Sequence, residues 1–268
     1  MEASIRNRLF HDAKQWMIEA GEMIRQQMHN PLEITTKSHA NDLVTTLDRE
    51  VEDFLVTNIK RKYPSHSVLG EEGYGDHLNS LDGCIWIIDP IDGTMNFVHQ
   101  KRSFAISIGI YDDGIGEVGL ILDVMSGVLY SAKKNEGAYK NNQKLPRLNE
   151  NLKLEETVLC LNHRWLLKNS LVNKEAMERL VKRVRGTRTY GSAALEFAYV
   201  AEGILGGYLS MSLAPWDVAA GAIIVNEVGG ITTNIHGEPI HLLGTNSILT
   251  CHPAIQHEII HGYFKANK

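Results

Sequence analysis

The chain has 268 residues, the length of one large domain or two modest ones, and its 43% hydrophobic and 22% charged residues are typical of a soluble globular protein. A net charge of −5 gives no basic footprint for nucleic acid. The three cysteines are widely spaced without a CxxC pair, which argues against a zinc site and predicts reduced thiols in the cytoplasm. We expect no signal peptide, and no apolar run reaches the ~18 residues that a membrane span needs.

The beginning of the chain has the periodicity of helices. Apolar residues recur at steps of three and four between Ile5 and Met28, which predicts a long amphipathic helix that ends before Pro31. A polar linker over residues 35–42 follows. A second helix is predicted from about Thr46 to Tyr63, because its apolar residues share one face and a proline follows its end.

Strand patterns come next. The apolar run Ile85–Ile88 predicts a buried strand that stops at Asp89, because Pro90 cannot continue a hydrogen-bonded ladder. Further strands are predicted at residues 68–73, which run into an acidic turn, and at residues 104–110, 117–123 and 127–132. Over residues 104–110 bulky and small side chains alternate, so that strand has one bulky face and one small face. This half therefore reads as a helix pair against a largely antiparallel sheet.

The second half of the chain alternates between strand and helix patterns. A polar stretch over Asn141–Leu154 is the candidate boundary, and it divides the chain into residues 1–145 and 146–268. Strands are predicted at residues 157–161, 187–190, 207–211 and 247–251, and helices at residues 173–184, 192–204, 217–228 and 253–264. The helix over residues 217–228 is nearly all apolar and should be buried. The predicted fold class is α/β, with an α+β N-terminal part and an α/β C-terminal part.

Acidic residues stand at the ends of several predicted elements. They are Glu71, Asp89, Asp92 and Asp217. Carboxylate oxygens are hard ligands that suit Mg²⁺, and two carboxylates around one turn can bridge two cations, as in sites for phosphoryl displacement. Gly93 and Thr94 follow where a helix begins, and their backbone N–H groups form a natural place for a phosphate.

The same acids also have structural interpretations. An aspartate after a strand often caps a turn, and Asp217 can be the N-cap of the apolar helix. Thr45 with Asp48 fits a capping box, while Glu71 and Glu72 can form a solvated acidic turn. The joint occurrence of these acids, with Asp-Pro-Ile-Asp-Gly-Thr over residues 89–94 as its most specific part, favours a catalytic site.

The motifs resemble those of the inositol monophosphatase family of the bacterial type, phosphatases that depend on Mg²⁺ and are sensitive to Li⁺. The first family signature, Asp-Pro-x-Asp-Gly-Thr-x-Asn after an apolar strand, is at Asp89–Asn96. The second, Trp-Asp-x-Ala-Ala-Gly, is at Trp216–Gly221. A Gly-Glu-Glu turn is at residues 70–72, Asp-Leu-Val-Thr-x-x-Asp is at residues 42–48, and Gly191–Ala194 is similar to the substrate-side loop of the family. These motifs cover nearly the whole chain in family order.

This resemblance implies a layered αβαβα sandwich of the sugar-phosphatase type, a homodimer, and two to three Mg²⁺ ions per site. The implied metal ligands are Glu71, Asp89, the Ile91 carbonyl, Asp92 and Asp217. Catalytic roles fall to Glu71, Thr94 and Asp48, of which Thr94 and Asp48 orient the attacking water, and supporting roles fall to Lys37 and Glu72. The implied substrate contacts are Asp92, Gly93, Thr94, Gly191, Ser192, Ala193, Ser210 and Asp217.

The activity implied is hydrolysis of inositol 1-phosphate and similar small phosphate monoesters. Animal members of the family carry a glutamate seven residues before the aspartate of the second signature, and that position is Ser210 here, so we expect a broad substrate range. The alternative main roles are NADP(H) 2′-phosphatase and fructose-1,6-bisphosphatase. Alternatives of other classes are a non-catalytic metal-binding regulator and an RNA-linked accessory role, which the net charge disfavours. His99 and His163 are candidates for the lining of the cleft, but a position at the surface or in a satisfied hydrogen-bond network is favoured. Tyr190 is a candidate either for stacking on a substrate ring or for the core.

Overall fold

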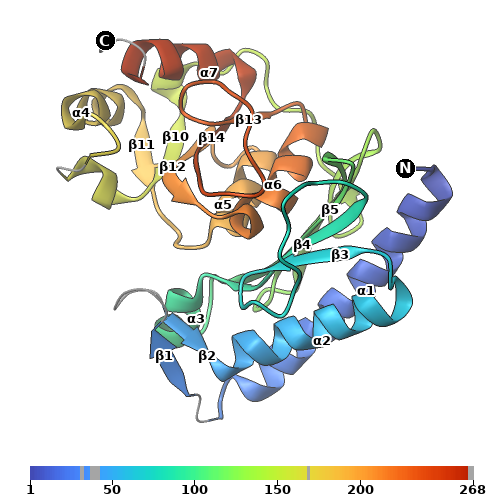
Figure 1. Cartoon of the computed structure of the whole chain (residues 1–268). Coiled ribbons are helices and arrows are strands. Elements are labelled where there is room, and N and C mark those ends of the chain that lie inside the picture. Colours follow the sequence, from blue (N-terminus) through green and yellow to red (C-terminus); the bar gives the residue numbers. More distant parts are fainter. Residues whose placement is uncertain (31–32, 37–42, 168–169, 265–268) are drawn as a thin grey trace.

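The fold consists of five layers, in the order αβαβα (Figure 1). The computed structural model describes residues 1–30, 33–36, 43–167 and 170–264. Two helices cover one face of a seven-stranded sheet, two more helices lie between that sheet and a five-stranded sheet, and further helices cover the far face of the second sheet. The predicted α/β sandwich is confirmed.

The first layer is the predicted pair of helices, α1 (Ala3–Gln27) and α2 (Thr46–Lys62). Their buried residues form one apolar cluster with bulky side chains of the first sheet, among them Trp86, Phe104 and Ile108. Burial of this shared apolar surface, worth about 25 cal/mol per Å², holds the helices on the sheet.

The first sheet is almost entirely antiparallel, as predicted. Its strands, in spatial order, are β3 (Ser67–Gly70), β4 (Cys84–Asp92), β5 (Ala105–Asp112), β6 (Ile115–Asp123), β7 (Val128–Lys133), β8 (Gly137–Lys140) and β9 (Gln143–Lys144). Only β3 and β4 run parallel within it. The alternation along β5 places its bulky side chains toward α1 and α2 and its small ones toward the middle layer.

The middle layer consists of α5 (Ala193–Ala201) and α6 (Pro215–Glu227), and α6 is buried as its apolar sequence predicts. Glycines on the small face of the sheet allow α6 to come close. A Cβ on Gly109 would lie 2.8 Å from the Cβ of Ala219, and one on Gly119 would lie 2.6 Å from the carbonyl oxygen of Ala220. The start of α6, which carries Asp217, is thereby fixed relative to β5.

The second sheet is mixed. Its strand order is β11 (Gly186–Arg188), β10 (Val158–Leu161), β12 (Gly207–Leu213), β14 (Asn246–Cys251) and β13 (Ile231–Thr233). The outer layer contains α4 (Lys174–Arg183) and α7 (Pro253–Ile259), which continues as a π-helical turn over Ile260–Phe264. Smaller elements are β1 (Ile34–Thr36), β2 (Leu43–Thr45), α3 (Thr94–Gln100) and the 3₁₀ turns η1 (Leu154–Glu156) and η2 (His163–Leu166). None of the helices in the described ranges is long and apolar enough to cross a membrane.

Some expectations from sequence were wrong. Strand β4 does not stop at Asp89 but continues through Pro90 to Asp92, because a bulge absorbs the proline and its missing N–H. The first two residues of the expected polar linker, Thr35 and Thr36, belong to β1, which pairs antiparallel with β2. The short strands β8, β9 and β13 were not predicted, since two to four residues carry too little pattern. The division into residues 1–145 and 146–268 stays a prediction; the chain leaves the first sheet after Lys144.

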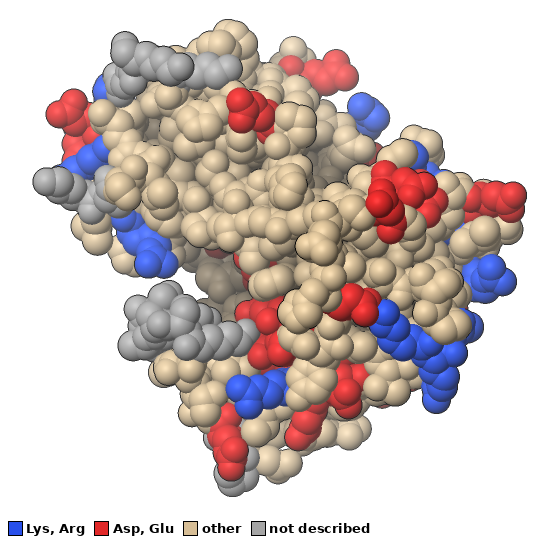
Figure 2. Space-filling view, in the orientation of Figure 1, with Lys and Arg blue, Asp and Glu red and all other residues tan. Residues whose placement is uncertain are grey.

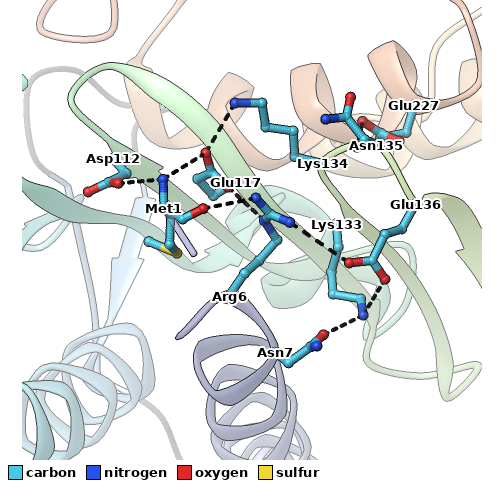
Figure 3. A network of polar contacts seen from close by, with 10 residues as sticks. All are labelled: Met1, Arg6, Asn7, Asp112, Glu117, Lys133, Lys134, Asn135, Glu136 and Glu227. Atoms are coloured by element: carbon cyan, nitrogen blue, oxygen red, sulfur yellow. Dashed lines mark hydrogen bonds and ion pairs between the residues drawn. The ribbon is translucent and has the colours of Figure 1, made fainter. Parts of the chain in front are cut away.

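A buried carboxylate anchors α1 to the first sheet (Figure 3). Glu117 on β6 is 1% exposed, and it accepts a hydrogen bond from Nε of Arg6 at 2.6 Å and one from Nζ of Lys134 at 3.2 Å. Nearby, Glu227 at the end of α6 accepts from the backbone N–H of Asn135 and of Gly137, both at 2.8 Å. These contacts join the first three layers at one end of the sheet.

Candidate active site

The two aspartates of the first motif lie on the bulged end of β4. Asp89 pairs with Ser107 and Asp92 with Ala105, so two residues of β4 lie opposite one residue of β5. On a regular strand, side chains three positions apart point to opposite faces. The bulge removes this restriction and allows both carboxylates to reach one place. The Ile91 N–H donates to Oδ1 of Asp89 at 3.0 Å and stabilises this turn.

Acidic side chains from distant segments meet at this bulge. Carboxylate oxygens of Asp89, Asp92 and Asp217 lie within 4.8 Å of one another. Glu71, from the turn after β3, forms a side-chain hydrogen bond with Asp89. Asp217 is not the N-cap of α6 but its third residue, and its Oδ2 accepts from the N–H of Ala214 at 2.7 Å. The structure therefore brings together all the acids that the sequence singled out.

Crowding and burial shape the electrostatics of this cluster. Burial raises the pKa of Asp89 well above its ordinary value, and the carboxylates of Glu71, Asp92 and Asp217 raise it further. Burial also raises the pKa of Asp92 to about 7, although hydrogen bonds from the start of α5 act to lower it. A divalent cation between these oxygens would relieve the repulsion among them. The donor set, all hard oxygens, fits Mg²⁺.

Asp92 connects the metal-side strand to the substrate-side loop. Its Oδ2 accepts from the Ser192 hydroxyl and, at 2.8 Å, from the Ala194 N–H, while its Oδ1 accepts from the Ala193 N–H at 3.1 Å. Ser192 is also the N-cap of α5, since its oxygen accepts from the Leu195 N–H at 3.3 Å. The positive end of the helix dipole favours a carboxylate at this position. The Gly191–Ala194 motif thus holds Asp92 in place.

The capping box predicted for Asp48 is present, and its second oxygen faces the site. As in a capping box, its Oδ2 accepts from the backbone N–H of Thr45 at 2.9 Å and from the Thr45 hydroxyl at 2.5 Å. Its Oδ1 lies 3.2 Å from the hydroxyl of Thr94, which is also 3.1 Å from the Ile91 carbonyl oxygen. Burial raises the pKa of Asp48 to about 6. One oxygen therefore caps α2, and the other faces the candidate catalytic threonine.

Glu52 is a site residue that sequence reasoning missed. Its side chain is fully buried on α2, and it accepts from the N–H of Glu72 at 2.7 Å and from the N–H of Tyr74 at 2.9 Å. Burial raises its pKa. Glu52 thereby fixes the turn that carries Glu71. The sequence contains one indication of this role: Glu52 is a charged residue on the apolar face of α2, three residues before Leu55.

Two further residues hold the loop before α5. Oε1 of Glu196, a buried residue, accepts from the N–H of Tyr190 at 2.7 Å and of Gly191 at 3.1 Å. Nδ2 of Asn96 donates to the carbonyl oxygens of Tyr190 at 2.6 Å and of Ser103 at 2.7 Å. Asn96 belongs to the first signature, and this clamp between α3 and the loop gives it a structural role.

A cavity of about 390 Å³ opens beside the acids. Six of the predicted substrate contacts line it: Asp92, Gly191, Ser192, Ala193, Ser210 and Asp217. Figure 2 shows a hollow with acidic side chains between the two halves of the molecule. Gly93 has φ of 95°, a conformation that favours glycine, and a Cβ there would lie 3.1 Å from the Gly191 carbonyl oxygen. Gly93 and Thr94 therefore lie next to the substrate-side loop.

The remaining predicted residues have the following positions. Glu72 is half-buried and bound to Glu52 through its N–H, whereas Lys37 lies outside the described residues. His99 and His163 are exposed, as expected. The ring of Tyr190 packs edge-on against Tyr199, with centroids 4.9 Å apart, so its neighbour is another side chain.

Comparison with known proteins identifies the family. The profile of the inositol monophosphatase family matches residues 7–267. The chain is 52% identical, over 96% of each chain, to inositol-1-monophosphatase of Bacillus subtilis (strain 168). Solved structures of SaIMPase-II of Staphylococcus aureus are also similar. The structure with bound 2′AMP is 43% identical to this chain, with a TM-score of 0.89, and the match covers 97% of this chain and 95% of that one. The structure with bound inositol monophosphate is 42% identical, with a TM-score of 0.87, and the match covers 97% of this chain and 94% of that one. The chain belongs to the inositol monophosphatase family.

Proposed function

We propose that the protein is a Mg²⁺-dependent phosphomonoesterase that hydrolyses inositol 1-phosphate and similar small phosphate esters. The observation that carries this proposal is the convergence of Asp89, Asp92 and Asp217 beside a cavity of about 390 Å³. That volume suits a small ester. The 52% identity to a bacterial inositol-1-monophosphatase supports the same reaction.

Two ions would share the acidic cluster. Glu71, Asp89 and the Ile91 carbonyl would hold one ion, and Asp89, Asp92 and Asp217 would hold the other. A third, weaker ion would lie near Glu71. When bound, Mg²⁺ would neutralise the charge of the phosphate ester and lower the pKa of a bound water below its bulk value of ~15.7. Asp89 is the bridging ligand in this scheme, and its position between Glu71 and the other two aspartates supports that role.

Thr94 and Asp48 position the attacking water. The Thr94 hydroxyl lies 3.2 Å from Oδ1 of Asp48, so it donates to that carboxylate and its oxygen accepts a hydrogen bond from the water. Because the pKa of Asp48 is about 6, its carboxylate is ionised at neutral pH and able to accept. The backbone N–H groups of Gly93 and Thr94 bind the phosphate, and Glu72 and Lys37 support the site.

The substrate range is broad in this proposal. Ser210 is 6% exposed and lines the cavity with a short hydroxyl side chain. Such a side chain offers a single contact to a polyol, so it discriminates little among leaving groups. The binding of both 2′AMP and inositol monophosphate by SaIMPase-II supports this breadth. NADP(H) and fructose 1,6-bisphosphate remain the alternative main substrates.

We also propose a homodimer and a cytoplasmic location. The family resemblance supports the dimer, and sedimentation of the purified protein tests it. The location rests on the thiols, since Cys84, Cys160 and Cys251 are free in the structure and the last two are buried. Reduced cysteines of this kind are usual in the cytoplasm.

The decisive experiment is phosphate release with and without Mg²⁺ from wild type, Asp89→Asn and Asp53→Asn. Asp89→Asn should abolish turnover, because a neutral amide is a poor bridging ligand. It should keep the fold, since its amide oxygen can still accept from the Ile91 N–H and repulsion among the acids falls. Asp53 is an exposed aspartate of α2, so Asp53→Asn should behave as wild type. Near-normal turnover in Asp89→Asn would refute the assignment.

The breadth of substrates needs its own panel. Inositol 1-phosphate, 2′AMP, NADP and fructose 1,6-bisphosphate should all release phosphate at rates within about two orders of magnitude of each other. The loss of one small contact with the substrate changes kcat/KM by only ~10–200-fold. Inositol 1-phosphate hydrolysed hundreds of times faster than every other compound would contradict a broad range while leaving the phosphatase activity intact.

A further inference from the structure

The cavity beside the acidic cluster extends toward a turn that the catalytic scheme does not use. Besides Asp92 and Asp217, its lining includes Asn162, Arg164 and Trp165. The last two belong to the 3₁₀ turn η2, and Asn162 caps this turn by accepting from the N–H of Arg164 at 3.0 Å. The turn therefore presents a defined pair of side chains to the same space that the phosphate ester enters.

Arg164 is a cation held at this end of the cavity. Its guanidinium carbon lies 5.4 Å from the centroid of the Trp165 ring, a cation–π contact that orients the exposed side chain. None of the ion pairs found among the described residues includes Arg164. Figure 2 shows basic side chains at the margin of the hollow, below α4 and β11. The positive charge is thus available to a ligand.

Trp165 provides a second, independent observation. The residue is 9% exposed, yet its indole N–H has no hydrogen-bond partner among the described residues. A buried indole N–H normally has an acceptor, and leaving one unpaired costs about 1–3 kcal/mol. An acceptor brought to η2 by a ligand, with a small shift of the turn, would remove this cost.

The lining of the cavity carries charges of both signs. Asp92, Glu196 and Asp217 are acidic, and Arg164 is basic. An ester whose scissile phosphate is bound at the acids through cations would have its alcohol part in the same cavity as Arg164. A guanidinium binds a phosphate group through two parallel hydrogen bonds, better than it binds a neutral hydroxyl.

We propose that Arg164, packed on Trp165, forms a subsite for a second phosphate group on the leaving alcohol. The protein then prefers phosphate esters whose alcohol carries another phosphate over the same esters without it. This inference rests on the proposed phosphatase function and specifies its substrate class.

A matched pair of substrates tests the subsite. Adenosine 2′,5′-bisphosphate and 2′AMP differ only in the second phosphate, and chromatography of the products shows that the 2′-phosphate is the one released. The wild type should have the higher kcat/KM for the bisphosphate. Arg164→Gln should lower the ratio of the two kcat/KM values by about tenfold, the usual effect of losing a charge-assisted hydrogen bond.

Two further variants separate the subsite from general effects. Arg179→Gln removes an exposed arginine of α4, away from the cavity lining, and should leave the ratio unchanged. Trp165→Phe removes the N–H but keeps an aromatic ring, and should lower the ratio without lowering the melting temperature, because that N–H has no partner in the free protein.

The outcomes are distinct. A wild-type ratio near one, or an unchanged ratio in Arg164→Gln, would overturn the subsite while the phosphatase function stands. If neither adenosine ester nor inositol 1-phosphate releases phosphate in the presence of Mg²⁺, the proposed function and the subsite both fall.

Discussion

At the scale of single residues, each side chain of the site serves the fold and the proposed chemistry together. Asp48 caps α2 with one oxygen and contacts Thr94 with the other. Asp92 accepts from the start of α5 while it lies within the acidic cluster. Capping and catalysis are therefore not competing interpretations of these aspartates. A carboxylate has enough lone pairs to accept structural hydrogen bonds and still bind a cation or contact a catalytic group. The structural hydrogen bonds fix the direction in which the remaining lone pairs point.

Substitution of Thr94 tests the water-positioning role. Thr94→Val removes the hydroxyl but keeps the shape, so we expect kcat to fall by about 100-fold, as for loss of an oriented proton acceptor. Thr94→Ser keeps the hydroxyl and should retain most of the activity. Initial rates of phosphate release at saturating Mg²⁺ measure both. Wild-type kcat in Thr94→Val would contradict the role of the hydroxyl.

At the scale of elements, the site is assembled from the ends of strands and helices that pack from different layers. Asp89 and Asp92 come from β4, Glu71 follows β3, and Asp217 belongs to the first turn of α6. Their relative positions depend on contacts behind the site. Two of these contacts, the buried Glu52 under the acidic turn and the glycines under α6, lend themselves to experiment.

Glu52→Gln weakens the support of the acidic turn. A glutamine offers one carbonyl oxygen to the two N–H groups of Glu72 and Tyr74, so one bond is lost, at a cost of about 1 kcal/mol. Glu71 should then be less well placed, and the Mg²⁺ concentration for half-maximal activity should rise about fivefold, with a smaller change in kcat at saturating Mg²⁺. Glu50→Gln, on the exposed side of α2, is the control. An unchanged Mg²⁺ requirement in Glu52→Gln would show that the turn needs no such support.

Gly109→Ala tests the packing of α6 on β5. The added methyl group would meet Ala219 Cβ at 2.8 Å, so the helix must move away or the core must absorb strain of about 1–3 kcal/mol. We expect urea unfolding to show that decrease in the free energy of unfolding. We also expect weaker activation by Mg²⁺, because Asp217 lies two residues before Ala219 and moves with the helix. Gly262→Ala adds a methyl group in open space and should change stability by less than ~0.5 kcal/mol. Comparable stability of the two variants would contradict the close packing.

At the scale of the whole molecule, the acidic cluster links folding, pH and metal binding. Burial of like charges destabilises the folded chain when no cation is bound, and that cost is shared by segments from both halves. A cation that binds only the folded state stabilises that state by mass action and so offsets this cost. The site therefore couples the two halves of the protein through its ligand.

The pH dependence follows from the raised pKa values. Burial raises the pKa of Asp92 from 3.8 to about 7 and that of Asp48 from 3.8 to about 6. In this range the folded, metal-free protein binds more protons than the unfolded chain, so its stability is greatest below the unfolded pKa and is lost as pH rises through ~6–7. Its melting temperature should fall between about pH 5 and pH 8, and Mg²⁺ should reduce that fall because it replaces the protons. A melting temperature that rises over this range without metal would contradict the account.

Much of this architecture was predictable because long, strongly periodic segments dominate it. The helices α1, α2 and α6 and the strand β5 follow directly from apolar spacing, and the acids were recognisable as a motif. The continuation of β4 through Pro90 was not, since a bulge depends on the pairing of β5 and not on local preference. A glutamate on the apolar face of α2 marks Glu52 as unusual, but its contacts and those of Glu196 were not predictable, for a similar reason. Their partners are backbone N–H groups of turns that only the folded chain brings near.

The central claim is that Asp89, Asp92 and Asp217 together bind divalent cations. Anomalous scattering from crystals soaked in Mn²⁺, which takes the same oxygen ligands as Mg²⁺, tests it most directly. The account predicts anomalous peaks between these three carboxylates and beside Glu71, and their loss in Asp89→Asn. Crystals of active protein with no peak at the three carboxylates, at a Mn²⁺ concentration that supports phosphate release, would contradict it.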